Sequence, residues 1–487
     1  MSDSMTATRR VLLNVHEHLK PDPHRYYINH CFSLPEKASR VGINMSFCND
    51  GDIFLFLSLH ALDKFRGSCM APGKHGEVSL ELWVAPEDAS AGGLPGSLPS
   101  GEWRVQVDNR VQEVEADYRL EVWAEFGPVP DAAALNWPED HIVRDKPGWY
   151  SGELHSHSSE SDGVETVDEV VDAALVAGLD FLAISDHFTI SQWRPLLNWM
   201  DRPIALIRSC ELTSERGHAN LHGLRDWVDV YTDRPGWDMN QAAAATRQQG
   251  ALFCINHPLI SNYGWQAFEF DWSRADLMEV FHTTSYGSNS YSLSFWDRLL
   301  CAGYHVIGIG GTDSHHPTEG ISVLGKLVTW VYADELSEKG ILSGLRSGQV
   351  TISQGAKVRF SAVNEHGMRA GMWESLPPGS LVSLEISYQS DEPLLLILIK
   401  DGFLIREISL VASPDEWSTL TCTQPEQLIH SDQPHPGYYR VELHAIIRDP
   451  VTGLSERNHL SMRAISNPIW VGMEPPRRLD EREIKGE

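Results

Sequence analysis

Residues 152–163 of the chain read GELHSHSSESDG, which sets two imidazoles one residue apart and a carboxylate shortly after them. Side chains at positions i and i+2 of an extended segment share a face, so His155 and His157 can bind one ion. Asp162 has two interpretations, because Ser-Asp-Gly is also typical of a turn in which the aspartate caps its own backbone. An H-x-H pair alone is a weak signal, and the flanking sequence decides between a metal site and ordinary surface residues.

Helices and buried strands alternate in the sequence that follows. Residues 166–178, TVDEVVDAALVAG, predict a helix that begins with a capping box and ends at a glycine. The apolar strand LDFLAIS comes next, and the pattern recurs as helix QAAAATRQQ before strand ALFCIN and as helix SFWDRLLCA before strand YHVIGIGG. This alternation predicts an α/β domain with a parallel sheet or barrel.

Each predicted strand of this region ends on groups that bind metals. Sheets and barrels of this class place their sites at the carboxyl ends of the strands, where such groups come together. Imidazole and carboxylate ligands without thiolate suit zinc, manganese or iron, and Glu211 can bridge two ions. The candidates in chain order are His155, His157, Asp186, His187, Glu211, His257, Asp313 and His315.

Several positions leave alternatives open. In GHANLHGL, residues 217–224, His218 and His222 would share a face of a strand, and their spacing does not separate them. Asp186 is either part of the site or a group that orients a ligand imidazole from behind. His282 follows another apolar strand and can contact substrate, whereas His316 is expected to face solvent.

The regions that flank the α/β domain have a different sequence pattern. Short alternating runs separated by Gly, Pro and Asp turns predict a β-sandwich-like domain over residues 1–147, with the linker PVPDAAALNWPED near its end. Residues 354–487 predict a second β-rich domain. The α/β domain then occupies residues 148–353.

Composition narrows the class of protein. The chain has 487 residues and a formal net charge of −28, which opposes binding along a nucleic-acid duplex. No apolar run reaches the length of about 18 residues that spans a bilayer, and no signal peptide is recognisable, so we expect a cytoplasmic protein. The seven cysteines form no C-x-x-C pair, which argues against a thiolate zinc site. A homo-oligomer is left open.

The motifs GELHSHSSESDG, AISDH, CELTSERGHANLHGL, INHP and GGTDSH, in this order, resemble those of the PHP (polymerase and histidinol phosphatase) metal-dependent hydrolases. They match the branch that includes carbaryl-hydrolase-like (CehA/McbA-type) enzymes. The resemblance covers about residues 148–353. It implies a distorted (β/α)7 barrel, flanked here by the two β-rich domains, and two or three divalent ions.

The same resemblance implies a ligand set. It favours Asp162 as a ligand and His218 over His222, because His218 follows Gly217 as in the family's G-H pattern. His282 departs from the small polar residue that related sequences often have there, which leaves the substrate class open. The implied ligands are His155, His157, Asp162, His187, Glu211, His218, His257, Asp313 and His315.

The leading functional hypothesis is hydrolysis by a metal-bridging hydroxide, most simply of a phosphoester in a small-molecule or nucleotide-like substrate, which can be anionic. Asp162, Asp186 and His282 are the candidate catalytic residues, for proton transfer or substrate contact. One alternative keeps the site and attacks a carbamate, ester or amide. An arginine reaching the site (Arg194, Arg208 or Arg225) would favour phosphate. The other alternative is a non-catalytic metal-binding assembly protein.

Overall fold

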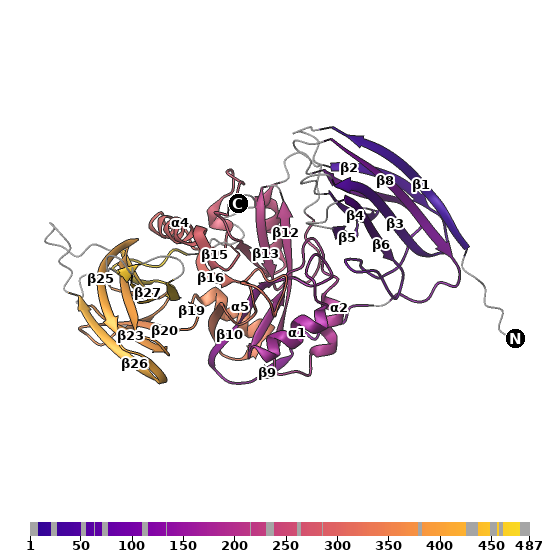
Figure 1. Ribbon diagram of the computed structural model, residues 1–487. Coiled ribbons are helices and arrows are strands. Elements are labelled where there is room, and N and C mark those ends of the chain that lie inside the picture. Colours follow the sequence, from indigo (N-terminus) through magenta and orange to yellow (C-terminus); the bar gives the residue numbers. More distant parts are fainter. Residues whose placement is uncertain are drawn as a thin grey trace.

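The computed structural model describes residues 8–20, 27–49, 55–62, 64–70, 76–109, 115–132, 134–214, 216–229, 238–260, 264–284, 286–377, 382–424, 437–448, 455–456 and 461–477. Three parts lie in a row, with the N-terminal strands in indigo at one end and the C-terminal strands in orange to yellow at the other (Figure 1). Among these residues, no helix is long and apolar enough to cross a membrane.

The N-terminal part is a sandwich of two four-stranded antiparallel sheets that share one core. In the strand 116–126, Ala116, Tyr118 and Leu120 are buried, whereas Asp117 and Arg119 between them are exposed. This alternation is what a strand with one solvated face requires. The sheets are, in spatial order, β1 (Thr8–Leu19), β8 (Ala116–Phe126), β3 (Ala38–Asn49) and β6 (Gly76–Val84), and β2 (Tyr27–Leu34), β7 (Gly101–Asn109), β4 (Leu55–Ala61) and β5 (Lys64–Met70).

The central part is a curled, mixed sheet of seven successive strands. They are β10 (Gly148–Ser156), β11 (Phe181–Ile184), β12 (Ala205–Ser214), β13 (Gly217–His222), β14 (Leu252–Ile255), β15 (Leu277–His282) and β16 (Ile307–Gly311). β13 runs antiparallel to both of its neighbours, and the other pairs are parallel. A bridge between Ser156 and Ser314 joins the carboxyl ends of β10 and β16, and the His157 N–H donates to the Ser314 carbonyl at 2.8 Å. The two ends of the curled sheet therefore meet at the edge where the predicted ligands lie.

The helix predicted from residues 166–178, after β10, is confirmed. It runs from Val167 to Val176 (α1), Thr166 and Glu169 form the capping box, and Gly178 follows with φ +73°. The other helices are α2 (Trp193–Leu196), α3 (Met239–Gln248), α4 (Asn289–Cys301) and α5 (Glu338–Ser347), with 3-10 turns η1 (Leu197–Trp199), η2 (Trp272–Arg274) and η3 (Tyr286–Ser288).

The strict (β/α)7 alternation is not evident in the described residues. β12 turns almost directly into β13, and η2 replaces a full helix between β14 and β15. Two residues cannot carry a crossover to a parallel strand, so β13 has to pair antiparallel with β12. The sheet keeps seven strands in sequence but loses helices at these connections.

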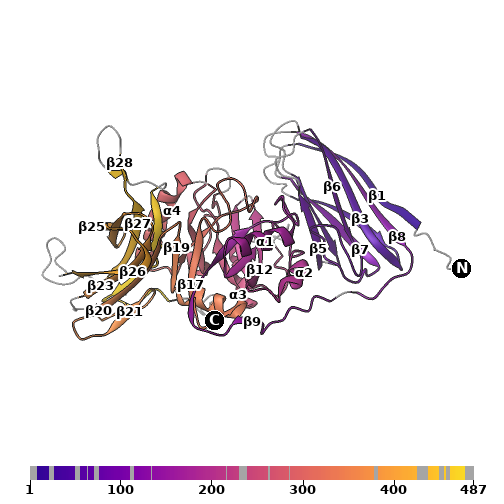
Figure 2. The same ribbon diagram turned by 60° about the horizontal axis from the view of Figure 1, so that its bottom comes forward.

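The sheet continues into the C-terminal part (Figure 2). β19 pairs with β17 on one side and β30 on the other, so hydrogen bonding runs across the predicted boundary at residue 353. The domain limits themselves stay predictions. The strands of this extension are β17 (Val328–Ala333), β19 (Val350–Ser353), β30 (Met462–Ser466), β27 (Gly437–Ala445), β24 (Leu394–Lys400) and β25 (Phe403–Leu410).

A second antiparallel sheet faces this extension across an apolar core. It contains β21 (Arg369–Gly371), β20 (Lys357–Asn364), β23 (Val382–Ser390) and β26 (Ser413–Gln424). Three short pairs complete the strands: β22 (Ser375–Leu376) with β31 (Ile469–Val471), β9 (Ile142–Arg144) with β18 (Leu336–Ser337), and β28 (Ile447–Arg448) with β29 (Ser455–Glu456).

The close approach of β10 and β11 makes one glycine sensitive to substitution. A Cβ added at Gly152 would lie 2.3 Å from both the ring and the carbonyl oxygen of Phe181, which is fully buried. We expect Gly152→Ala to lower the free energy of unfolding by about 1–3 kcal/mol through this overpacking, measured by urea denaturation. Gly148→Ala in the same strand is the control, because its nearest neighbour, Tyr150, is 3.7 Å away. Equal destabilisation by both variants would contradict the prediction.

Candidate metal centre

The predicted ligands converge at the carboxyl edge of the curled sheet, where β10 and β16 meet. Their side chains come from β10, β12 and β13 and from the residues that follow β10, β11, β14 and β16. Nearly all are buried, and His315, with a side chain 34% exposed, marks the open side. Three overlapping groups have ligand atoms within 4.8 Å of one another: His157, Asp162, His187 and His315; His155, Glu211 and His257; and His155, His157 and Asp313.

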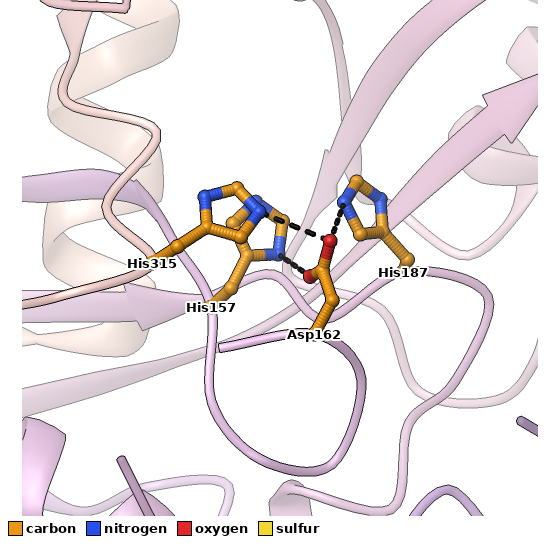
Figure 3. Close-up of side chains that lie close together, drawn as sticks. All are labelled: His157, Asp162, His187 and His315. Carbon is orange, nitrogen blue, oxygen red and sulfur yellow. Dashed lines mark ion pairs between the residues drawn. The ribbon is translucent and has the colours of Figure 1, made fainter. Parts of the chain in front are cut away.

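The first group is arranged around the Asp162 carboxylate (Figure 3). Its Oδ2 lies 3.2 Å from His315 Nε2 and 3.5 Å from His187 Nε2, and its Oδ1 lies 3.9 Å from His157 Nδ1. The carboxylate therefore points toward the three imidazoles and not toward its own backbone. Asp162 does this from within a turn, and its role as a ligand stays a prediction.

Glu211 lies at the centre of the site and contacts five imidazoles. Its position on β12 brings it into reach of all three groups, and a role in bridging two ions stays a prediction. Its carboxylate oxygens lie 2.8 Å from His187 Nδ1, 3.1 Å from His218 Nδ1, 3.4 Å from His155 Nε2, 3.5 Å from His157 Nε2 and 3.8 Å from His257 Nε2.

Three buried imidazole nitrogens at this centre lack a hydrogen-bond partner among the described residues: His155 Nε2, His157 Nδ1 and His257 Nδ1. Buried polar atoms are nearly always paired, and leaving one unpaired costs about 1–3 kcal/mol. Coordination of divalent ions would satisfy them. The donor set, imidazole and carboxylate without thiolate, fits zinc, manganese or iron.

Burial and neighbouring charged groups shift the pKa values of the histidines in opposite directions. Burial would lower the pKa of His155, but Glu279, Asp313 and Glu211 outweigh it and raise that pKa well above its usual value. Burial, together with His315 and His187, lowers the pKa of His157 to about 4. His157 is therefore neutral at physiological pH, which is the form that coordinates metal.

Three residues in or next to the cluster have a backbone conformation with positive φ. Phe188, His257 and Asp313 have φ values of +53°, +24° and +51°. Residues with a side chain seldom adopt positive φ, and such strain gathers at functional sites. Here it occurs where the chain leaves a strand, within or next to the cluster.

The strand register separates His218 from His222. Thr213 pairs with His218 near the carboxyl end of β12, whereas Ser209 pairs with His222 deeper in the sheet. His218 contacts Glu211, although it belongs to none of the three groups, and His222 Nδ1 lies 2.8 Å from Ser209 Oγ. His218 thus lies nearer the cluster than His222, and its role as a ligand stays a prediction.

Asp186 corrects one expectation. Its carboxylate accepts hydrogen bonds from the Ser158 N–H (2.7 Å), the Ser158 hydroxyl (2.6 Å) and the Ser161 hydroxyl (2.7 Å). It holds the turn between His157 and Asp162 and orients no ligand imidazole among the described residues. The serines of SHSSES occupy its oxygens, a long-range contact that the local sequence did not reveal. Its role in proton transfer stays a prediction.

Two histidines near the site have other surroundings. His282 is buried, its Nε2 lies 3.0 Å from Ser288 Oγ, and its ring centroid is 6.0 Å from that of His257. It borders the cluster but belongs to none of the three groups. His316 is half exposed with Glu165 3.9 Å away, as expected for a solvent-facing residue.

Two buried glutamates were missed by the sequence reasoning. Glu279 Oε1 lies 2.7 Å from His155 Nδ1, which leaves His155 Nε2 directed at the cluster, and its Oε2 accepts from the His257 N–H. Glu153 accepts from the backbone N–H groups of His155 and Thr312 and so ties β10 to the end of β16. The available signal was a lone acid inside an apolar strand, as in LMEVF.

Glu279 provides a test of this support. We expect Glu279→Gln to weaken metal binding by about 10- to 100-fold, because the amide orients His155 less well and does not strengthen its basicity. Competition with a chromophoric chelator measures the affinity. Glu319→Gln, in an exposed loop, is the matched control. Unchanged affinity in Glu279→Gln would contradict the positioning role.

The three arginines named as candidates for phosphate recognition have other positions in the described structure. Arg208 pairs with Glu139 (2.7 Å) and Glu338 (2.9 Å), and Arg194 and Arg225 line a separate cavity.

Two aromatic residues near the strand ends, Trp265 and Tyr286, are engaged in contacts within the protein. Trp265 packs edge-on against Phe270, and the Tyr286 hydroxyl accepts from Gln354 Nε2. These contacts describe ordinary loop packing.

No family model matches the chain, and no curated protein matches it. Among solved structures, it is similar to a two-domain protein from Bacteroides vulgatus that contains a predicted PHP-like metal-dependent phosphoesterase, at 19% identity over 66% of this chain and 99% of that chain, with a TM-score of 0.38. It is also similar to an amidohydrolase from Chromobacterium violaceum, at 16% identity over 35% of this chain and 90% of that chain, with a TM-score of 0.29. The family assignment therefore stays a prediction from the motifs.

Proposed function

We propose that this protein is a metal-dependent hydrolase whose centre holds two or three divalent ions. The observation that carries the proposal is the set of three overlapping groups of imidazole and carboxylate donors within 4.8 Å, with Glu211 in contact with members of each. Zinc, manganese and iron are the candidate ions.

Divalent ions at this centre supply Lewis acidity, which polarises the scissile bond and lowers the pKa of water. The protein's own residues prepare the site for that chemistry. Glu211 holds the groups together, Glu279 fixes the ring of His155, and Asp186 holds the turn that presents Asp162. His282, beside His257, is the proposed substrate contact.

The bond that is hydrolysed has two candidates. The motifs favour a phosphoester of a small molecule. The positions of the arginines favour a neutral substrate, such as a carbamate, ester or amide. Arg208 is already paired with two carboxylates, and Arg194 and Arg225 line another cavity. Phosphate sites commonly use a bidentate arginine, and the guanidinium of Arg208 already has two carboxylate partners.

Metal analysis and an adjacent pair of histidine variants test the proposal. After metal-replete expression, we expect about two ions per chain and a loss of hydrolytic rate of about 10²–10³-fold in His315→Ala. His316→Ala is the control, because its side chain faces solvent. Fewer than one ion per wild-type chain, or equal rates in the two variants, would overturn the proposal.

A substrate panel separates the two bond types and the non-catalytic alternative. Phosphomonoesters, phosphodiesters, aryl esters and carbamates are tested with Mn or Zn present. Turnover of phosphoesters alone supports the first candidate, and turnover of esters or carbamates alone supports the second. Full metal content without any turnover would favour a metal-binding assembly protein.

A further inference from the structure

A cavity of about 630 Å³ lies between the N-terminal sandwich and the central sheet. The end of β4, the start of β5 and residues 94–97 and 99 form its sandwich side. Residues 190, 191, 193, 194, 225 and 226 form much of the other side. β5 faces α2 in both views (Figures 1 and 2). None of the nine predicted metal ligands lines the cavity, so it is separate from the metal centre.

Hydrogen bonds between the N-terminal sandwich and the central part fix the two sides of this cavity relative to each other. The Ser68 hydroxyl donates to the Phe188 carbonyl at 2.8 Å, and the Thr189 hydroxyl donates to the Gly92 carbonyl at 3.0 Å. The Gly92 N–H in turn donates to Glu160 at 2.9 Å. The cavity is therefore a preformed part of the fold, as ligand pockets usually are.

The charge of its wall is opposite to that of the chain. Lys64, Arg66, Arg194 and Arg225 line the cavity, and Asp226 is the one carboxylate among its described lining residues. The protein as a whole carries a formal charge of −28. A cleft lined mainly by one sign of charge concentrates ligands of the opposite sign.

Arg66 is the interior cation of this set. It is only 5% exposed, and its guanidinium donates to the carbonyls of Ser97 (2.7 Å), Leu94 (3.1 Å) and Gly96 (3.2 Å), with no carboxylate partner among the described residues. A guanidinium has five N–H groups, so these three acceptors leave two for another partner. Burial lowers the pKa of Arg66 to about 10, which still leaves it charged at neutral pH. A buried charge without a counter-charge is costly, and a bound anion would offset that cost.

Apart from Ser97 and Ser191, the rest of the wall is apolar. Leu62 and Leu135 supply its exposed apolar surface, at 58% and 39% exposure, whereas Phe65 and Trp193 are buried in the wall. The volume is in the range of small-molecule sites, about 300–1,000 Å³. The combination suits a ligand with an apolar body and an anionic group.

We propose that this cavity is a second binding site, for a small organic anion with an apolar body, distinct from the metal centre. The anionic group meets Arg66, Arg194 and Arg225, and the apolar body packs against Leu62 and Leu135.

Isothermal titration calorimetry of the full chain with 2-naphthalenesulfonate tests the proposal. We expect saturable binding of one equivalent, little binding of the neutral 2-naphthalenemethanol, and affinity about tenfold weaker in Arg194→Gln and in Arg225→Gln. Asp226→Asn should bind as tightly as wild type or more tightly. Arg119→Gln, an exposed cation on β8 outside the cavity, is the matched control and should bind as wild type.

A variant of the metal centre separates the two sites. His155→Ala should retain full binding of 2-naphthalenesulfonate. Loss of binding in His155→Ala would place the anion at the metal centre and overturn the proposal. Equal binding of the neutral compound, or undiminished affinity in both Arg194→Gln and Arg225→Gln, would overturn it as well.

Discussion

Replacement of Glu211 by glutamine is expected to lower the hydrolytic rate by about 10³-fold, corresponding to about 4 kcal/mol of transition-state stabilisation. The change keeps the shape of the side chain and removes its charge. Glu211 contacts imidazoles of all three donor groups, so its loss weakens every group at once. Burial would raise its pKa, but His187, His155 and His218 outweigh this and lower the pKa well below its usual value, so the carboxylate is ionised.

Metal content and rate should fall together in this variant. Mass spectrometry of the metals in the purified protein is expected to show the loss of at least one equivalent relative to wild type. Glu319→Gln is the matched control, since it makes the same chemical change in an exposed loop beyond His315. Full metal content with a wild-type rate in Glu211→Gln would contradict the bridging role.

Replacement of Arg440 by methionine is expected to lower the free energy of unfolding by about 3–5 kcal/mol. Arg440, on β27, is 2% exposed and forms a bidentate pair with Asp297 on α4 at 2.8 and 2.7 Å. It also donates to Glu442 at 2.6 Å. The substitution leaves two buried carboxylates without their cation at the contact between the central and C-terminal parts.

An exposed arginine pair is the matched control for this prediction. Arg369 donates to both oxygens of Glu385, but its side chain is 65% exposed. Arg369→Met should therefore cost at most about 1 kcal/mol in urea denaturation. If Arg440→Met costs no more than Arg369→Met, the buried pair does not stabilise the fold as argued.

The pH dependence offers a second readout of the same network. Burial alone would raise the pKa of Glu442, but Arg440 and His444 outweigh it and lower the pKa to about 2. A lowered folded-state pKa contributes stability that is present above the unfolded value of 4.5 and is lost as the pH falls toward 2. The difference in stability between wild type and Arg440→Met should narrow over that range.

Short-range features could be predicted from the sequence alone. The helix that starts at Thr166 depends on a capping box and on Gly178, and both are properties of neighbouring residues. The H-x-H pair likewise depends on the extended backbone at the end of β10, which brings His155 beside His157. The residue types in the candidate site, and the strand ends that carry them, could be predicted from the sequence for the same reason.

Long-range packing decided the rest. Pairing of β12 with β13 separated His218 from His222, and the return of β16 to β10 placed Asp313 beside His155 and His157. The partners of Asp186 and Glu279 and the cavity around Arg66 also depend on segments far apart in the chain. Local sequence determines which conformation a segment adopts and which ligands it can offer. Only the tertiary structure determines which of those groups face one another, because that depends on strand register and on the closure of the sheet.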